Sequence, residues 1–373
     1  MAVRSVVILT AGFGEGHNAA ARNLLQALNA RHPDVSAIVI DVFDVAYGPI
    51  NRIAQRNYLW LINHAPSLWN KVFQWLDRTP VVAKKIGVFG RAARLLSEII
   101  DERNPDIIVS TYPGYNHLLD HVHRSKPARS FTQVTVVTDS ITINSVWLTG
   151  HSDWLLVCNE DTRAVIARMG FPAEKIIVSG FPVPTAFVEL CTPKAPPRPG
   201  EKWKVLFMVN SGKRIAVDVL RALSSMPDIE VTLTVGRDEA LMQRLKLAAS
   251  EAGVDARFFG WTDQMPRLIA ESHVVISKAG GATVQECFAA TSPMLISQVV
   301  PGQEEGNARL IADHGAGVIA ESPSEIVRAL QAGYADHGVL WKQWYQAAGR
   351  LSRPQASAEI ADWMTTLPIP KRT

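Results

Sequence analysis

A glycine-rich stretch near the start of the chain ends in a histidine. Residues 12–17 read Gly-Phe-Gly-Glu-Gly-His, between an apolar run at 6–10 and a helix-like run at 19–31. Glycines between a strand and a helix leave backbone amides free at the positive helix end, which suits an anion. The stretch lacks the Gly-Lys-Ser/Thr of a P-loop, and His17 replaces the last glycine of a dinucleotide fingerprint. Because an imidazole accepts protons near neutral pH, His17 is a candidate general base, and the alternative is a turn whose glycines serve only packing.

A second glycine turn occurs in the other half of the chain, at residues 277–286, SKAGGATVQE. Gly280 and Gly281 would let a ligand approach the backbone, and Thr283 offers a hydroxyl near the start of the next helix. Glu286 follows about one turn later, where a carboxylate could accept two ribose hydroxyl protons.

Two polar residues follow the next predicted strand, at 294–296. Gln303 and Glu304 lie in the stretch PGQEEGN, residues 301–307. Since ligands of parallel sheets bind at the carboxyl ends of the strands, we expect both residues to converge on the crevice of the second glycine turn. Together the two stretches predict a nucleotide-sugar pocket.

Further candidates also follow predicted strands. Asp139 comes after residues 133–138 and would orient His17, bind an acceptor, or cap the next helix. Ser211 and Gly212 come after residues 205–209, followed by Lys213 and Arg214. These basic side chains would meet the charge of a leaving diphosphate, or simply be solvated.

No metal site or disulfide framework is expected. The sequence contains no Asp-x-Asp pair. His117 and His121 have i, i+4 spacing but lack the glutamate of a zinc protease motif. The three cysteines, Cys158, Cys191 and Cys287, form no Cys-x-x-Cys pair, which fits a reducing compartment.

Short apolar runs alternate with helical patterns throughout the chain, which predicts an α/β fold of two doubly wound domains with parallel sheets. Residues 1–182 would form the first domain, 183–200 a proline-rich linker and 201–340 the second domain, with a helix at 341–366 returning to the first. The expected strands are residues 6–10, 37–42, 107–110, 133–138, 154–157, 176–179, 205–209, 231–235, 256–259, 274–277, 294–296 and 317–319.

Four motifs carry a family resemblance. GFGEGHNAAARNLLQAL, VVTDSITINSVWL, SKAGGATVQECFAATSPMLI and PGQEEGNARLIADHGAGVI are similar in order and spacing to the monogalactosyldiacylglycerol synthase and processive diacylglycerol glucosyltransferase family. The resemblance covers most of residues 5–325. It implies the GT-B fold, in which two Rossmann-like domains face each other across a cleft. It also implies inverting transfer from a UDP-sugar to a lipid hydroxyl without metal or cofactor.

The resemblance further implies roles for the candidate residues. Glu286 would hold the ribose, the Gly260-Trp261 turn the uracil, and the acceptor would bind the first domain with its hydroxyl near His17. The remaining implied contacts are Gly280, Gly281 and Thr283 with the diphosphate, Gln303 and Glu304 with the sugar, and Gly14 and Gly16 with the acceptor. Ser211 and Gly212 are further predicted donor contacts, in a segment where the family more often has additional glycine or alanine. One departure is Asn144, where the family usually has a histidine.

Residues 51–100 have the composition of a membrane-contacting segment. They contain eight basic and two acidic residues together with several aromatic ones, although the whole chain has a formal net charge of only +3. Trp69, Phe73 and Leu76 fall at helical spacing, and the predicted membrane contacts are Trp69, Lys71, Phe73 and Trp75. The alternative is a helical layer packed on the first sheet. Nucleic acid is not expected, because no readout motif accompanies the charge.

The sequence therefore predicts a cytoplasmic enzyme, peripheral on the inner face of the cell membrane, that moves glucose or galactose from UDP-glucose or UDP-galactose to diacylglycerol or a similar lipid. A UDP-N-acetylglucosamine 2-epimerase-like isomerase and a non-catalytic nucleotide-sugar or lipid sensor are the alternatives. The residues leave open the sugar, the acceptor, single or repeated addition, the oligomeric state, and whether His17 or Asp139 is the base.

Overall fold

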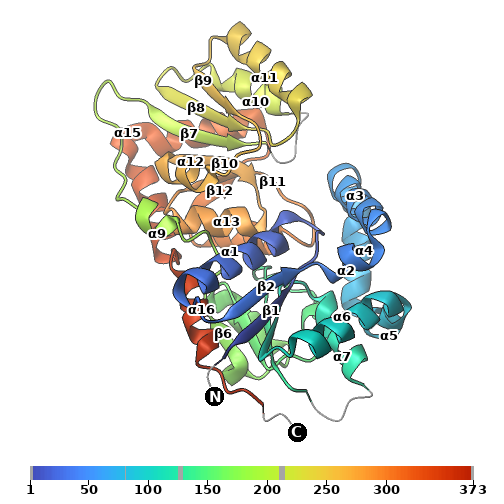
Figure 1. Ribbon diagram of the computed structural model, residues 1–373. Helices are drawn as coiled ribbons and strands as arrows, with labels where there is room; N and C mark the ends of the chain where they lie inside the picture. The colour runs from blue at the N-terminus through green and yellow to red at the C-terminus, as the bar shows by residue number, and fades with distance from the viewer. Residues whose placement is uncertain (1–2, 80, 125–128, 210–214, 371–373) are drawn as a thin grey trace. The chain divides into compact units, whose positions relative to one another are not determined.

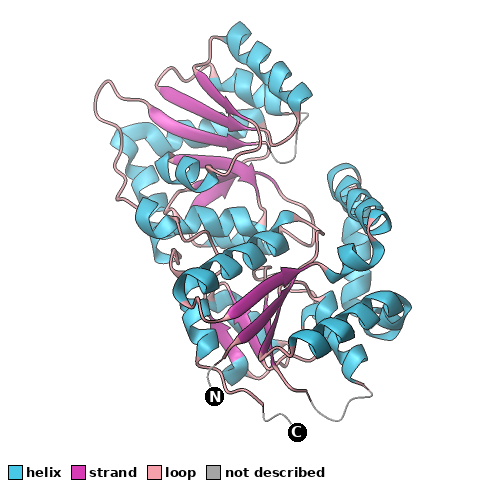
Figure 2. Cartoon of the chain, viewed as in Figure 1, coloured by secondary structure: helices cyan, strands magenta, loops and turns pink. Residues whose placement is uncertain are grey.

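The computed structural model describes residues 3–79, 81–124, 129–209 and 215–370, and within them it contains two parallel six-stranded sheets flanked by helices (Figures 1 and 2). Each strand predicted from the apolar runs is present, which confirms the α/β fold. The strands are β1 (Ser5–Leu9), β2 (Ser36–Ile40), β3 (Ile107–Ser110), β4 (Thr132–Val136), β5 (Trp154–Val157), β6 (Ile176–Val178), β7 (Trp203–Met208), β8 (Ile229–Thr234), β9 (Ala256–Phe259), β10 (Val274–Lys278), β11 (Met294–Gln298) and β12 (Gly317–Ile319).

The first sheet has the order β2-β1-β3-β4-β5-β6, with every pair parallel. One face packs on α1 and α16 through Leu24, Leu28 and Ile360. The other packs on α2, α6 and α7 through residues such as Leu96 and Tyr115. The helices of this part are α1 (Glu15–Arg31), α2 (Val42–Tyr47), α3 (Pro49–His64), α4 (Pro66–Arg78), α5 (Val81–Lys85), η1 (Ile86–Phe89), α6 (Gly90–Arg103), α7 (Gly114–His123), η2 (Ser145–Trp147), α8 (Glu160–Arg168), η3 (Ala173–Lys175) and α16 (Ala356–Thr365).

The second sheet has the order β12-β11-β10-β7-β8-β9, again parallel. In each sheet the chain order reverses once, between β1 and β3 and between β7 and β10, and such switch points are where doubly wound sheets bind ligands. The helices of this part are α9 (Phe187–Leu190), α10 (Ala216–Leu223), α11 (Glu239–Ala252), α12 (Met265–Glu271), α13 (Gly281–Ala289), α14 (Glu305–Asp313) and α15 (Pro323–Arg350).

The chain divides into two compact units that are not continuous in sequence. The first comprises the residues up to Thr185, Pro301–Gly306, and the residues from Gln355 onward, and the second comprises the rest. The segment predicted as a helix at 341–366 is shared between them. Trp341 and Trp344 of α15 lie in the core of the second unit, whereas α16 packs against α1 in the first.

The proline-rich segment 183–200 contains the short helix α9 and then packs on the second unit. The side-chain amine of Lys194 donates to the carbonyl oxygen of Ser272 at 2.9 Å, at the end of α12. Burial lowers the pKa of this amine to about 8. The segment is therefore attached to one unit over part of its length.

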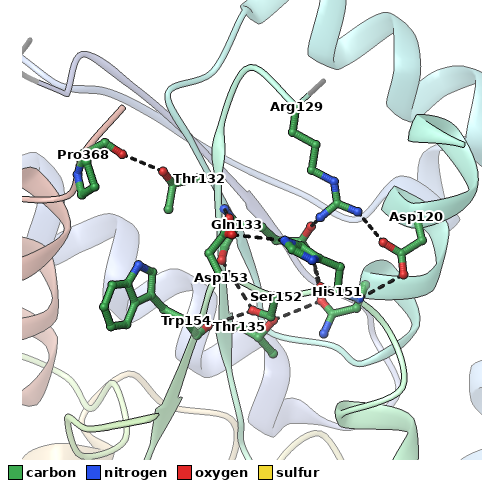
Figure 3. A network of polar contacts seen from close by, with 11 residues as sticks. Asp120, Arg129, Thr132, Gln133, Thr135, His151, Ser152, Asp153, Trp154 and Pro368 are labelled. Atoms are coloured by element: carbon green, nitrogen blue, oxygen red, sulfur yellow. Dashed lines mark hydrogen bonds and ion pairs between the residues drawn. The ribbon is translucent and has the colours of Figure 1, made fainter. Parts of the chain in front are cut away.

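Buried polar side chains join β4, β5 and α7 at the amino end of the first sheet (Figure 3). The Gln133 side chain is fully buried; its amide nitrogen donates to Asn116 Oδ1 and the His151 carbonyl, and its oxygen accepts from Arg129. Arg129 also pairs with Asp120. The polar groups of Gln133 and the Arg129 guanidinium thus have hydrogen-bond or ion-pair partners. The network lies at the edge of the sheet opposite the carboxyl ends of the strands.

We expect Gln133→Leu to lower the free energy of unfolding of the first unit by about 2–4 kcal/mol, because the replacement keeps the volume but leaves several buried polar groups without partners. Urea unfolding followed by tryptophan fluorescence measures this. Gln264→Leu, at an exposed glutamine, is the control and should change stability by less than ~0.5 kcal/mol. Equal effects of the two substitutions would contradict a stabilising role for the network.

Candidate active site

His17 lies at the switch point of the first sheet, in the first turn of α1. Gly14 precedes the helix with φ 101°, a left-handed conformation that favours glycine. The imidazole is 8% exposed, and its Nδ1 lies 2.7 Å from the Thr111 carbonyl oxygen and 3.0 Å from Thr138 Oγ1. These two residues come directly after β3 and shortly after β4, so the ends of three adjacent strands fix the ring.

These contacts also fix the protonation state of His17. A carbonyl oxygen only accepts, so Nδ1 carries the proton and Nε2 keeps a lone pair. Burial lowers the pKa of the imidazole to about 4, and the Thr111 carbonyl only partly opposes this shift. The positive end of α1 disfavours an imidazolium as well. At neutral pH His17 is therefore a neutral ring with one nitrogen able to accept a proton.

Asp139 follows β4 and lies on the same cavity as His17. Its Oδ2 accepts a hydrogen bond from Trp147 Nε1 at 2.8 Å. Burial raises the pKa of this carboxyl to about 6; the nearby Glu304 adds to the rise, and Trp147 opposes it. The following 3-10 helix, η2, is capped by Asn144 instead of Asp139. The Thr111 carbonyl, and not Asp139, orients the imidazole. Asp139 is a partly buried carboxyl group that faces the cavity.

The cavity has a volume of about 280 Å³ and a mostly apolar lining. Tyr112 lies edge-on to His17, with ring centres 5.2 Å apart, and stacks on Phe13 of the glycine stretch. The lining residues are Phe13, His17, Tyr58, Trp69, Phe73, Leu76, Val82, Tyr112, Pro113, Gly114, Asp139, Asn144, Val146, Trp147 and Gln303. A proton acceptor and a carboxyl group thus share a pocket walled by aromatic rings.

The segment Pro301–Gly306 belongs to the first unit, although the sequence places it between elements of the second. A Cβ at Gly306 would overlap the Ser140 carbonyl oxygen, so only glycine permits this close approach. At Gly302, φ is 79°, and a Cβ would lie 2.9 Å from Asn70 Oδ1. Gln303 consequently lines the cavity of His17, and Glu304 is buried near Asp139. The structure groups these two residues with His17 and Asp139.

Helix α4 has two different faces, which divides the predicted membrane contacts. Trp69 and Phe73 are half-buried and, with Leu76, line the cavity. Lys71 and Trp75 lie on the exposed face, where Leu68 and Arg78 complete a stripe at i, i+3, i+7 and i+10 spacing. The prediction treated all four residues as one surface, but Trp69 and Phe73 are cavity-lining residues because successive helical positions point about 100° apart.

The predicted nucleotide contacts that the structure describes lie at the carboxyl ends of strands in the second unit, whereas the predicted sugar contacts Gln303 and Glu304 belong to the first unit. Gly280 precedes α13, whose first turn contains Gly281 and Thr283, and Glu286 is partly exposed one turn further. Trp261 follows β9 and is 68% exposed, with the Arg237 guanidinium 5.5 Å from its ring centre. The remaining predicted contacts, Ser211 and Gly212, lie outside the described residues.

Sequence reasoning missed several cavity residues. Tyr58, Tyr112 and Trp147 were not singled out, and neither was Thr111, whose backbone carbonyl holds His17. Thr111 and Tyr112 directly follow β3, so their position beside the switch point was the available signal. No sequence signal distinguished Tyr58, because an aromatic residue in an amphipathic helix is usually explained by packing.

The described residues contain no cluster of three His, Cys, Asp or Glu side chains placed to hold a metal ion, and His117 instead lies 3.1 Å from the Val146 carbonyl oxygen. None of their helices combines the length and hydropathy needed to cross a membrane.

Comparisons with known proteins agree with the sequence resemblance. Residues 17–183 match the model of monogalactosyldiacylglycerol (MGDG) synthase, and residues 213–336 match the C-terminal domain of glycosyltransferase family 28. The processive diacylglycerol beta-glucosyltransferase of Bacillus cytotoxicus is 27% identical over 371 residues, covering 96% of this chain and 92% of the relative. The protein of that name from Bacillus mycoides is 27% identical over 379 residues, with the same coverage. The resemblance is therefore confirmed.

Solved structures confirm the GT-B fold with its two Rossmann-like domains. MurG from Acinetobacter baumannii has a TM-score of 0.61 at 13% identity, covering 98% of this chain and 100% of its own. The UDP-GlcNAc 2-epimerase from Neisseria meningitidis, bound to UDP-GlcNAc, has a TM-score of 0.61 at 12% identity, covering 96% of this chain and 99% of its own. At these identities the likeness extends to the fold alone.

Proposed function

We propose that this chain, which matches the models of MGDG synthase and of the glycosyltransferase family 28 C-terminal domain, is a glycosyltransferase that transfers glucose or galactose from a UDP-sugar to diacylglycerol or a similar lipid. The observation that carries the proposal is the aromatic cavity of the first unit, where a neutral histidine and a carboxyl group meet an apolar lining. Such a pocket would accept the glycerol end of a lipid, and His17 would take the proton of its hydroxyl.

In the proposed reaction the acceptor oxygen attacks the anomeric carbon as the bond from that carbon to the phosphate oxygen breaks. Nε2 of His17 takes the hydroxyl proton, UDP leaves with the bonding electron pair, and the configuration inverts. General-base help of this kind contributes roughly 10²- to 10⁴-fold. Asp139, ionised above about pH 6, would stabilise the imidazolium across the same cavity. No metal ion or cofactor takes part in the proposed steps.

Residues of both units would bind the donor and the acceptor. Gly280, Gly281 and Thr283 stand at the start of α13, where free backbone amides and the helix dipole favour a diphosphate. Glu286 would bind the ribose and Trp261 would stack on the uracil. Gln303 and Glu304 would hold the sugar, and Gly14 and Gly16 would leave room for the acceptor hydroxyl, since neither has an atom within 4 Å of an added Cβ.

The exposed stripe on α4 would hold the enzyme on an anionic membrane surface. Leu68 and Trp75 are 54% and 52% exposed beside Lys71 and Arg78. The neighbouring helix α3 adds Ile53 and Trp60, which are also exposed. Apolar and basic side chains on one helical face are typical of helices lying in the headgroup region.

We expect the double variant Leu68→Glu/Trp75→Glu to lose at least about tenfold in affinity for vesicles containing phosphatidylglycerol, because two apolar contacts become charges repelled by the lipid. Cosedimentation at several salt concentrations measures this. Leu247→Glu, at a 61% exposed leucine of α11, is the matched control and should bind as the wild type does. Unchanged vesicle binding by the double variant would contradict the assignment.

Radiolabelled UDP-glucose and UDP-galactose offered with diacylglycerol vesicles test the reaction. A glycolipid from either donor supports the proposal, and no lipid product from both would refute it. The epimerase likeness gives a rival outcome, in which UDP-N-acetylglucosamine changes configuration without any lipid. The matched domain families favour transfer.

A further inference from the structure

Tyr58 joins three parts of the first unit around the cavity. Its ring lies edge-on to Phe13 of the glycine stretch and to Trp69 of α4, with ring centres 5.8 Å and 5.0 Å apart. Its hydroxyl donates to Gln303 Oε1 at 2.8 Å. A residue of α3 thereby reaches a loop that lies 245 positions away in the sequence.

This hydrogen bond determines which end of the Gln303 amide is available to a ligand. Burial raises the pKa of Tyr58 far above the neutral range, so the hydroxyl keeps its proton and can donate. With the Gln303 oxygen accepting from Tyr58, the amide NH₂ group, with its two donors, points away from Tyr58 and can meet another partner. A sugar hydroxyl oxygen is a suitable acceptor for it.

The loop has little freedom to find another arrangement. Gly302 sits against Asn70 and Phe73 of α4, and Gly306 sits against the backbone of Ser140 and Thr142. The loop is closely packed at both ends, and the Tyr58 hydroxyl restricts rotation of the Gln303 side chain. Fixing a side chain before the ligand arrives reduces the ordering cost of binding.

We propose that Tyr58 is a positioning residue that fixes the Gln303 amide so that its NH₂ group binds a hydroxyl oxygen of the donor sugar. The inference rests on the proposed function for the role of Gln303. It assigns to α3, a helix of the first unit, a part in recognising the donor sugar.

The test is calorimetric binding of UDP-glucose, UDP-galactose and UDP to the full chain and its variants. Tyr58→Phe should weaken binding of the preferred UDP-sugar by about 3- to 10-fold, the range for one lost hydrogen bond, and leave UDP binding unchanged. Gln303→Glu should lose at least as much sugar-dependent affinity, because a carboxylate can only accept. Tyr58→Phe in a Gln303→Ala background should have no further effect.

Tyr334→Phe is the control, because the Tyr334 hydroxyl is buried with no hydrogen-bond partner among the described residues, and its ring stacks on Trp203. It should bind every ligand as the wild type does. An unchanged UDP-sugar affinity in Tyr58→Phe, an equal loss for UDP, or additive effects of the two substitutions would overturn the inference. Failure of lipid glycosylation with the predicted affinities intact would refute the acceptor assignment alone.

Discussion

Replacing His17 by alanine is expected to lower kcat/KM for lipid glycosylation by roughly 10²- to 10⁴-fold, because the acceptor hydroxyl loses its proton acceptor. Donor affinity should stay within about twofold, since the predicted nucleotide contacts belong to the second unit. Initial rates with vesicle-bound acceptor and calorimetry with UDP separate the two effects. Added imidazole should restore part of the rate, which a purely structural role of His17 would not explain.

His117→Gln provides the matched control for this experiment. His117 is also buried, also hydrogen-bonded to a backbone carbonyl, and also has a pKa lowered by burial, but it does not line the cavity. Its replacement should change the rate by less than about fivefold. If His17→Ala retained full turnover, the base would have to be another group, with Asp139 the remaining candidate in the cavity.

Asp139→Asn should reduce activity and increase stability at the same time. Above about pH 6 the wild-type carboxylate is charged in a site that disfavours charge, and its pKa is raised from 3.8. The folded state therefore binds this proton more tightly than the unfolded state, so stability is lost as pH rises from about 4 to 6. The difference is at most about 3 kcal/mol, and less here because the side chain is partly exposed.

Urea unfolding of Asp139→Asn at pH 8 should thus give a free energy about 1–3 kcal/mol above that of the wild type, and the difference should vanish near pH 4. Activity at pH 8 should fall about 10- to 100-fold, because the imidazolium loses its counter-charge. We expect kcat/KM of the wild type to fall as the pH drops below about 6, because Asp139 then takes up a proton. This decline should be absent in the variant. Glu304 and His17 face the same site in both proteins, so the comparison isolates Asp139.

Asp153→Asn should have the opposite sign and serves as the control. Its carboxylate bonds to His151 and to the Gln133 backbone amide, and these partners hold its pKa below the usual range. The charge therefore stabilises the fold at pH 8, and its removal should lower stability. A loss of stability in both variants would contradict the account given for Asp139.

Local sequence patterns were sufficient for the strands and for the position of His17. Apolar runs of three to six residues mark parallel strands buried on both faces, and glycines followed by a helical pattern mark the turn where β1 ends. Once β1 is central, the histidine after it must lie at the carboxyl edge of the sheet. Neither conclusion requires knowledge of distant contacts.

The rest of the site depends on contacts between residues far apart in sequence. Helix α4 carries apolar side chains on two faces, and nothing in its own sequence shows that Trp69 faces a cavity while Trp75 faces solvent. The placement of Gln303 depends on close approaches at Gly302 and Gly306 to α4 and to the strand end after β4. Such packing depends on contacts in the folded structure, and it produces no periodic pattern in the sequence.

The discontinuity of the first unit has a consequence for synthesis on the ribosome. The face of the first sheet that packs against Leu24 and Leu28 of α1 is completed by Ile360 of α16, which is translated after the whole of the second unit. Until α16 has been synthesised, this apolar face of the first unit is incompletely covered, although all strands of the second unit have already been made. We expect the emerging protein to depend on chaperones at this stage, and its order of folding to run against its order of translation.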